Sequence, residues 1–162
     1  MQACSFTGNR IIPEAEIAGL SDLLRRAIEY AYSKGCRDFN CGGALGFDTM
    51  AALAVLEKRE KYPDIRLRLL LPCLSQTKYW SPRDISVYER IKSLADEVIF
   101  VSLDYDGGCM HRRNARLVDE CEILIAYSSK ADGGAAKTLR MAEARGREVY
   151  NLYSRVGIAK NN

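Results

Sequence analysis

Glycines, an aspartate and a helical apolar pattern come together in the stretch "NCGGALGFDTMAALAVLEK", which begins at Asn40. Gly42, Gly43 and Gly46 lie just before the predicted helix, and Asp48 falls in its first turn. Glycines allow positive φ angles and let the backbone approach a ligand closely, while the first N–H groups of a helix are unpaired and attract an anion. The stretch therefore predicts a site that holds a phosphate group.

Asp48 supports two interpretations. Its charge would complement the dipole of the helix whatever the protein does. If the side chain instead faces a ligand, its carboxylate could accept hydrogen bonds from ribose hydroxyl groups, as acidic residues do in dinucleotide sites. The sequence leaves both interpretations open.

Glycines followed by a predicted helix recur at other places in the chain, and cations come soon after them. Arg10 and Arg113 are the best candidates for neutralising a phosphate, because the planar guanidinium matches phosphate oxygens in a bidentate way. Asn114 could donate to a phosphate or cap a short helix, and Thr138 could bind the ligand or lie on a helix surface. No residue is assigned a catalytic role. The expected ligand-binding residues are Gly8, Arg10, Gly42, Gly43, Asp48, Arg113, Asn114, Gly133, Gly134 and Thr138.

Short apolar runs alternate with longer amphipathic runs along the chain, which is typical of an α/β domain with a mainly parallel sheet. Five helices are predicted, and the tail from Ser154 is expected to fray. The carboxyl ends of parallel strands share one edge, where open sheets bind ligands, so the glycine-bearing turns should meet there. The six predicted strands are "ACSFT", "RDFNC", "LRLLLPC", "EVIFVS", "EILIAY" and "REVYNL".

The composition fits a soluble protein with one domain over residues 1–162, since 48% of the residues are hydrophobic and 28% are charged. No run approaches the roughly 18 apolar residues that cross a bilayer, and no export signal opens the chain. We therefore expect a cytoplasmic location without membrane contact. Six scattered cysteines and one histidine, His111, indicate buried thiols rather than a metal site. The net charge of +3 does not by itself indicate nucleic-acid binding.

Six motifs cover nearly the whole chain in a fixed order: "CSFTGNR", "GGALGFDTMAA", "LPC", "DYDGGCMHRRN", "VDECEILIAY" and "GGAAKT". This set resembles a bacterial family typified by YpsA. That family belongs to the SLOG superfamily, a Rossmann-like group that also includes the DNA-processing protein DprA and the Lonely-Guy phosphoribohydrolases. The resemblance implies a Rossmann-like three-layer αβα sandwich that binds a nucleotide or nucleotide-derived ligand. With right-handed crossovers, it implies the strand order 3-2-1-4-5-6.

One motif departs from the enzymes of this group. Lonely-Guy proteins resemble one another through PGGxGTxxE, whose closing glutamate serves catalysis, whereas the matching stretch here is "DGGAAKTLR". Arg140 occupies the position of the glutamate, and Glu143 lies nearly one turn further on. The departure favours a binding module, such as a sensor that holds an ADP-ribose-like or NAD-related molecule, over an enzyme.

In this hypothesis the partner is a small-molecule nucleotide, and no cofactor is certain. Two alternatives remain. One is a nucleotide N-glycosidase, in which Asp48 or Glu143 would stabilise charge as the bond breaks. The other is DprA-like binding of single-stranded DNA. The sequence disfavours nucleic acid as a partner, because the basic residues lack interleaved aromatic residues. Related Rossmann-like proteins often pair, so the resemblance also implies a homodimer.

Overall fold

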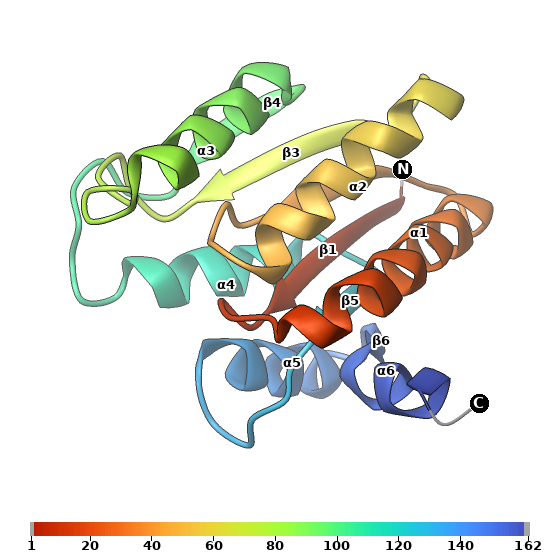
Figure 1. Ribbon diagram of the computed structural model, residues 1–162. Coiled ribbons are helices and arrows are strands. Elements are labelled where there is room, and N and C mark those ends of the chain that lie inside the picture. Colours follow the sequence, from red (N-terminus) through yellow and green to blue (C-terminus); the bar gives the residue numbers. More distant parts are fainter. Residues whose placement is uncertain (1, 161–162) are drawn as a thin grey trace.

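A single sheet of six parallel strands forms the centre of the molecule. The computed structural model describes residues 2–160, with side chains as far as residue 156 (Figure 1). Each predicted apolar run overlaps one strand, so the prediction of six strands is confirmed. The strands are β1 (Gln2–Gly8), β2 (Cys36–Cys41), β3 (Arg66–Leu71), β4 (Glu97–Phe100), β5 (Ile123–Tyr127) and β6 (Glu148–Asn151).

Burial on both faces explains why the central strands are so apolar. Residues 3–7 of β1 are buried, and so is every residue of β5. Strands covered on both faces become continuous apolar runs, because neither face is left to water. The edge strands β4 and β6 contain no fully buried residue, and they carry the glutamates Glu97 and Glu148.

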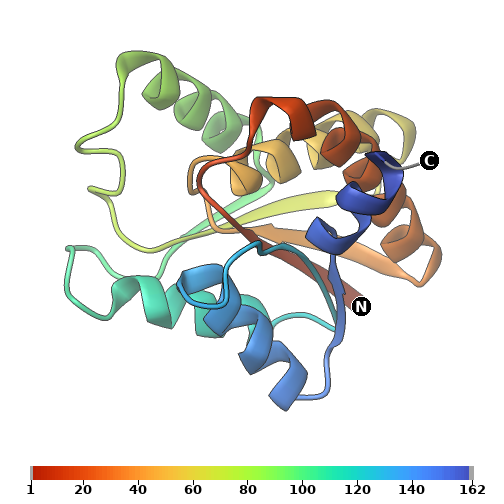
Figure 2. The ribbon, with the colours of Figure 1, turned by 60° about the horizontal axis from the view of Figure 1, so that its bottom comes forward.

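Helices cover both faces of the sheet and give the three-layer αβα sandwich. Figure 2 shows α1, α2, α3 and α6 along one face and α4 and α5 along the other. In agreement with this view, α1 contacts α2 and α6, and α4 contacts α5. The predicted fold class is confirmed. The helices are η1 (Glu14–Glu16), α1 (Ile17–Ser33), α2 (Phe47–Lys61), α3 (Pro82–Leu94), α4 (Cys109–Asp119), α5 (Gly134–Ala144) and α6 (Tyr153–Lys160).

The order of the strands differs from the prediction. The sheet runs β4-β3-β2-β1-β5-β6, whereas we expected 3-2-1-4-5-6. After β3 the chain steps outward once more, through α3 to β4, where Arg68 of β3 pairs with Glu97 of β4 at 2.7 Å. Helix α4 then leads back to β5, beside β1. Right-handed crossovers allow either path, so handedness did not distinguish them. The direction in which successive strands are added to the sheet therefore reverses between β1 and β5.

The C-terminal segment is also more ordered than predicted. We expected fraying from Ser154, but α6 spans Tyr153–Lys160. Leu152 and Val156 are buried four residues apart, so the beginning of this helix packs on the core. The Asn151 side chain accepts a hydrogen bond from the backbone N–H of Tyr153 at 3.2 Å and holds the first turn in place. Tertiary packing thus offsets the weak helical pattern of the tail.

The larger hydrophobic core lies between the sheet and the helices α1 and α2. Phe6 stacks on Phe39 with ring centroids 6.3 Å apart, and Phe47 stacks on Tyr127 at 6.1 Å. A Cβ atom at Gly8 would lie 2.4 Å from the Phe47 ring, so this glycine lets α2 approach the end of β1. Within residues 2–160, no helix has the length and apolar content to traverse a bilayer.

Candidate ligand-binding site

A cavity of about 820 Å³ opens at the carboxyl edge of the sheet, where the strand order reverses. We call it the switch-point cavity. Segments far apart in the sequence converge there: the turn after β1, the start of α2, α4, the loop after β5 and the start of α6. Open α/β sheets bind ligands at this place. The cavity is lined by residues 7–11, 13, 16, 44, 48, 110, 113, 114, 127, 129, 130, 132–135 and 153.

Asp48 supplies a buried carboxyl group to the cavity, and only 5% of the residue is exposed. Its Oδ2 accepts a hydrogen bond from the backbone N–H of Ala44 at 3.2 Å. Its Oδ1 is buried and has no hydrogen-bond partner within the described part of the chain. Burial raises the pKa of Asp48, while the charge of Arg113 and the Ala44 N–H act in the opposite direction. The cavity thus contains a buried acceptor without a donor.

Gly46 allows α2 to present Asp48 at this place. It caps the helix with a φ of 76°, and a Cβ atom on it would lie 2.3 Å from the carbonyl oxygen of Arg10. The following N–H, from Phe47, donates to the carbonyl oxygen of Asn9 at 3.0 Å. The start of α2 is therefore fixed against the turn after β1, and a side chain at position 46 would separate them.

Arg113 supplies a buried guanidinium group, since the residue is 5% exposed. The group donates to the carbonyl oxygen of Gly42, and its Nε donates to Oδ1 of Asn114 at 2.8 Å. Burial lowers the pKa of Arg113, and the nearby charge of Asp48 opposes that change. Its hydrogen bonds go to neutral acceptors, and the guanidinium forms no salt bridge within the described residues.

Gly42 makes room for both ionisable groups. A Cβ atom at this position would lie 2.6 Å from Nη1 of Arg113 and 2.9 Å from Oδ2 of Asp48. Any larger residue would therefore push the guanidinium and the carboxyl group out of place. The glycine acts on the site through this space rather than by touching the cavity, because it is absent from the cavity lining.

The N-terminus of α5 forms another wall of the cavity. Gly133 caps this helix with a φ of 110°, a backbone conformation that residues with a side chain rarely adopt. Helix geometry leaves the first N–H groups of α5 without intrahelical acceptors. Gly133, Gly134 and Ala135 all line the cavity, so these N–H groups begin at its wall. The helix dipole adds partial positive charge there.

The rim adds two exposed cations and an aromatic ring. Arg10 and Lys130 line the cavity, and neither forms a salt bridge within residues 2–156. Tyr153, which is 41% exposed, contributes a ring from α6. Tyr127 is 1% exposed, and its hydroxyl donates to Glu16. Burial, followed by this hydrogen bond, raises the pKa of the tyrosine. Tyr127 thus supports Tyr153, with the two rings edge-on at 5.6 Å.

Seven of the ten residues predicted from the sequence line this cavity, and three lie outside it. The three outside are Gly42, described above, Gly43 and Thr138. Gly43 has a φ of 72°, and a Cβ atom there would lie 2.4 Å from Leu71, so this glycine serves packing against β3. Thr138 is 1% exposed and donates to the carbonyl oxygen of Gly134 at 2.7 Å. The seven are Gly8, Arg10, Asp48, Arg113, Asn114, Gly133 and Gly134.

Thirteen of the twenty lining residues were not among the ten predicted, and Asn9, Ser129 and Tyr153 are three of these. Asn9 donates through its side chain to Ser129, which joins the turns after β1 and β5. Both residues lie two positions after the end of a predicted strand, so their position was a usable signal. Tyr153 had no such signal, because it lies next to a segment that was expected to fray.

Other residues considered in the sequence analysis lie elsewhere. Glu143 is exposed near the C-terminal end of α5 and does not line the cavity, which removes the shifted carboxylate from consideration. Arg140 donates to the carbonyl oxygen of Ala131 at 2.9 Å. Within the described residues, no three His, Cys, Asp or Glu side chains gather as metal ligands would.

The chain matches a known protein family over most of its length. The model of the YpsA family, described as "YspA SLOG family", matches residues 13–155. YoqJ, an SPbeta prophage-derived protein of Bacillus subtilis, is 29% identical, and the match covers 83% of this chain and 87% of YoqJ. The motifs quoted from the sequence fall largely within these matched regions.

Solved structures share the fold over nearly the whole chain. DprA from Streptococcus pneumoniae matches with a TM-score of 0.67 at 15% identity, over 93% of this chain and 50% of that one. DprA from Helicobacter pylori, studied for its mode of binding single-stranded DNA, matches with a TM-score of 0.66 at 17% identity, over 91% of this chain and 63% of that one. The chain thus spans only half to two thirds of these structures. At such identities the likeness concerns the fold.

Proposed function

The chain belongs to the YpsA SLOG family, and from this membership and the geometry of the cavity we propose that it binds a nucleotide or nucleotide-derived ligand. An ADP-ribose-like or NAD-related molecule fits the proposal. The ligand would occupy the switch-point cavity, whose volume of about 820 Å³ lies within the range of about 300–1,000 Å³ for small-molecule sites. Holding this ligand, as a sensor does, would be the main role of the protein.

The observation that carries the proposal is the unpaired Oδ1 of Asp48. Leaving a buried acceptor without a donor costs about 1–3 kcal/mol. A ribose hydroxyl would supply the donor from inside the cavity and remove this cost. Because the carboxyl group is already held by Ala44 through Oδ2, its free oxygen is oriented before the ligand arrives.

The phosphate groups would lie toward the N-terminus of α5. The unpaired N–H groups and the dipole of that helix favour an anion. Arg10 and Lys130 at the rim, and the buried Arg113, add positive charge around the same cavity. Cations that are not engaged with carboxylates can contact phosphate oxygens without first breaking an ion pair.

We propose that the protein binds its ligand without converting it, because of the residues near α5. Arg140 occupies the position of the catalytic glutamate of Lonely-Guy proteins, and its side chain donates a hydrogen bond to a backbone carbonyl oxygen. Asp48 is the remaining carboxyl group deep in the cavity, with Glu16 and Asp132 also in its lining. Cleavage of an N-glycosidic bond would therefore have to depend on one of these three carboxyl groups.

Calorimetric titration of the full chain with ADP-ribose, NAD and ribose phosphates tests the proposal. We expect at least one of them to bind and Asp48→Asn to bind it about tenfold more weakly. Asp84→Asn is the matched control, because Asp84 also lies in the first turn of a helix but outside the cavity. Chromatography of the same mixtures detects any released base.

Mass spectrometry of molecules released from the denatured protein complements these titrations. A nucleotide-type molecule recovered from the wild type and missing from Asp48→Asn would support the proposal. If nothing is recovered and none of the nucleotides binds the wild type, the proposal is wrong. Equal affinity of the wild type and Asp48→Asn would remove Asp48 from the site.

Binding of single-stranded DNA is the second candidate function, because two neighbouring loops expose tyrosine rings and a lysine lies beside one of them. Tyr79 in the loop before α3 is 88% exposed, with Nζ of Lys78 5.4 Å from its ring. Tyr105 in the loop before α4 is 67% exposed. A backbone hydrogen bond of 3.3 Å from Leu74 to Leu103 joins these loops. Bases can stack on such rings, which the sequence analysis had not brought together.

Fluorescence anisotropy with a labelled oligothymidylate tests this second function. Binding should weaken steeply as salt rises, and the double change Tyr79→Ala with Tyr105→Ala should weaken it further. Leu53→Ala is the control, because Leu53 is also an exposed hydrophobic residue but lies on α2, outside the cavity and outside both loops. Absence of salt-dependent binding would contradict a DNA function, and equal binding by the double variant would exclude these two tyrosines from the DNA-binding surface.

A further inference from the structure

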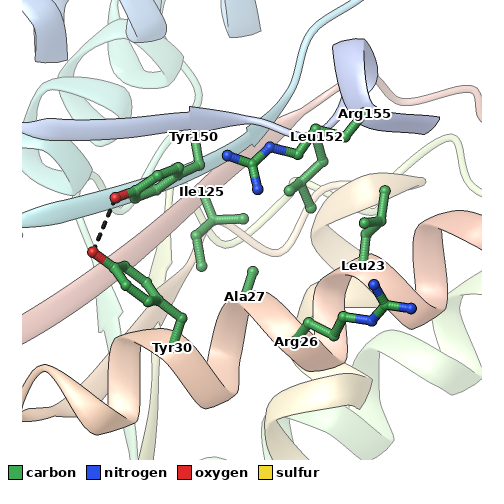
Figure 3. Close-up of a pocket in the computed structure, with 8 residues that line it drawn as sticks. All are labelled: Leu23, Arg26, Ala27, Tyr30, Ile125, Tyr150, Leu152 and Arg155. Atoms are coloured by element: carbon green, nitrogen blue, oxygen red, sulfur yellow. Dashed lines mark hydrogen bonds between the residues drawn. The ribbon is translucent and has the colours of Figure 1, made fainter. Parts of the chain in front are cut away.

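A second cavity, of about 310 Å³, lies between α1 and the start of α6 (Figure 3). We call it the α1–α6 pocket. Its floor is aliphatic and comes from three elements: Leu23 and Ala27 of α1, Ile125 of β5, and Leu152 just before α6. The small side chain of Ala27 leaves room between the helix and the sheet. The apolar part of a bound small molecule would cover this floor and exclude water from it.

Two tyrosines form one end of the α1–α6 pocket. Tyr30 and Tyr150 meet edge-on, with ring centroids 5.4 Å apart and their hydroxyl oxygens 3.0 Å apart. Both hydroxyls also donate to the carboxylate of Glu148. The two hydroxyl groups therefore already have a hydrogen-bond acceptor, and the aromatic rings form the surface that a ligand would contact.

Two arginines complete the pocket lining. Arg155 of α6 reaches toward the Tyr150 ring, with its guanidinium carbon 5.5 Å from the ring centroid (Figure 3). It forms no salt bridge within residues 2–156. Arg26 of α1 pairs with Asp22 at 2.6 Å, but both side chains are more than half exposed. A solvent-exposed pair of this kind is weak, so an incoming anion can compete for the guanidinium.

We propose that the α1–α6 pocket binds a small organic carboxylate with an apolar body. The body would lie on the aliphatic floor against the tyrosine wall, and the carboxylate would lie between Arg26 and Arg155. Guanidinium groups match carboxylates in a bidentate way, which gives the ligand its orientation. The pocket volume lies at the low end of small-molecule sites, so the body is the size of a phenylalkyl or medium aliphatic chain.

This site is separate from the switch-point cavity. The two cavities share no lining residue, although Leu152 of one is followed directly by Tyr153 of the other. A nucleotide suits the α1–α6 pocket poorly, because an aliphatic floor offers no partner to ribose hydroxyls. The inference therefore does not depend on the proposed nucleotide function.

Titration of the full chain with phenylbutyrate, octanoate and their neutral amides tests the proposal, with binding followed by calorimetry and ligand-observed NMR. We expect the carboxylates to bind saturably and the amides about tenfold more weakly. Arg155→Ala and Arg26→Ala should each weaken the carboxylates. Arg25→Ala is the matched control, because Arg25 lies next to Arg26 but pairs with Glu57 outside the pocket.

Ala27→Leu tests the location of the site without relying on charge. Leucine keeps the helix propensity of α1 and fills the space above the floor. Binding of phenylbutyrate should be lost while the circular dichroism spectrum and the thermal transition are retained. If Ala27→Leu unfolds the protein, Ala27→Met, whose side chain is flexible, replaces it in the same titration.

Three results would overturn the proposal. Equal binding of carboxylates and amides would exclude the arginines as anion partners. Full binding by the filled variant would place the ligand elsewhere. The failure of both carboxylates to bind the wild type would show that the pocket takes no such ligand.

Discussion

The switch-point cavity and the α1–α6 pocket differ in where they place charge. The first buries an aspartate and an arginine, each 5% exposed, beneath turns of backbone. The second has aliphatic side chains at its floor and exposed arginines in its lining. Burying ions is costly unless other groups offset the cost. Turns and helix ends at the carboxyl edge offer such groups, whereas the side of a helix has its backbone hydrogen bonds already made.

The carboxyl groups of the two regions respond to their surroundings in opposite directions. Burial raises the pKa of Asp48 in the switch-point cavity. Hydrogen bonds from Tyr150 and then Tyr30 lower the pKa of Glu148 beside the α1–α6 pocket. The comparison indicates that one carboxyl group is costly to the free protein and the other stabilises it. Such a cost is common at binding sites, where stability is given up for a ligand.

The largest expected effect comes from removing the buried guanidinium. Arg113→Met should lower the free energy of unfolding by about 2–4 kcal/mol, because the Gly42 carbonyl and Asn114 lose their donor and Asp48 loses its compensating charge. Arg155→Met should change it by only about 0.5 kcal/mol, since Arg155 is exposed. Urea denaturation measures both. Equal effects would mean that the two regions do not differ in buried charge.

The second effect concerns the backbone at the start of α5. Gly133→Ala should cost about 1–3 kcal/mol, because its φ of 110° is strained for alanine although space is open around it. Gly107→Ala, which has open space and no positive φ, should stay within about 0.5 kcal/mol. Thermal unfolding of both variants checks this. A neutral Gly133→Ala would show that the α5 cap is not held in this conformation.

The third effect is a gain of stability. A raised pKa means that Asp48 favours folding below its unfolded pKa and that this contribution is lost as pH rises through the folded pKa. Asp48→Asn should therefore have a free energy of unfolding about 1 kcal/mol higher than that of the wild type at pH 8, and this gain should vanish in acid. Denaturation series across pH measure the difference. A loss of stability at pH 8 would contradict the unpaired state of Oδ1.

The smallest effect has the opposite dependence on pH. A lowered pKa means that Glu148 stabilises the fold above its unfolded pKa of about 4.3 and that this contribution is lost as pH falls through the folded pKa. Glu148→Gln should cost about 0.5 kcal/mol at pH 7, because the residue is exposed and its hydrogen bonds are screened by solvent. The same denaturation series should show no difference in strong acid. A constant difference would assign the effect to packing of the tyrosines.

Much of the architecture could be predicted from local patterns. The run "LRLLLPC" predicts a buried strand because a strand covered on both faces is typically this apolar, and β3 overlaps it over five residues. The strand order could not be predicted in the same way. The same segments satisfy a right-handed path whether β4 returns beside β1 or continues past β3, and pairing such as Arg68 with Glu97 decides between them.

The site was predictable in its composition and less so in its contacts. Gly42, Gly43 and Gly46 stand in one turn and look alike in the sequence. The structure gives them different neighbours: the charged pair beside Gly42, Leu71 beside Gly43 and the Arg10 carbonyl beside Gly46. Local sequence shows that a turn needs glycine. Only the neighbouring elements show which atoms would occupy the place of its missing side chain.

The amino-acid sequence by itself determined the elements and the edge at which the glycine-bearing turns gather, because apolar periodicity and turn chemistry act over a few residues. The tertiary structure alone decided that Asp48 and Arg113 share a cavity beside Gly42, that the sheet reverses between β1 and β5, and that the tail folds into α6. These features depend on contacts between distant segments. Local sequence patterns do not predict the burial and the charge compensation at such contacts.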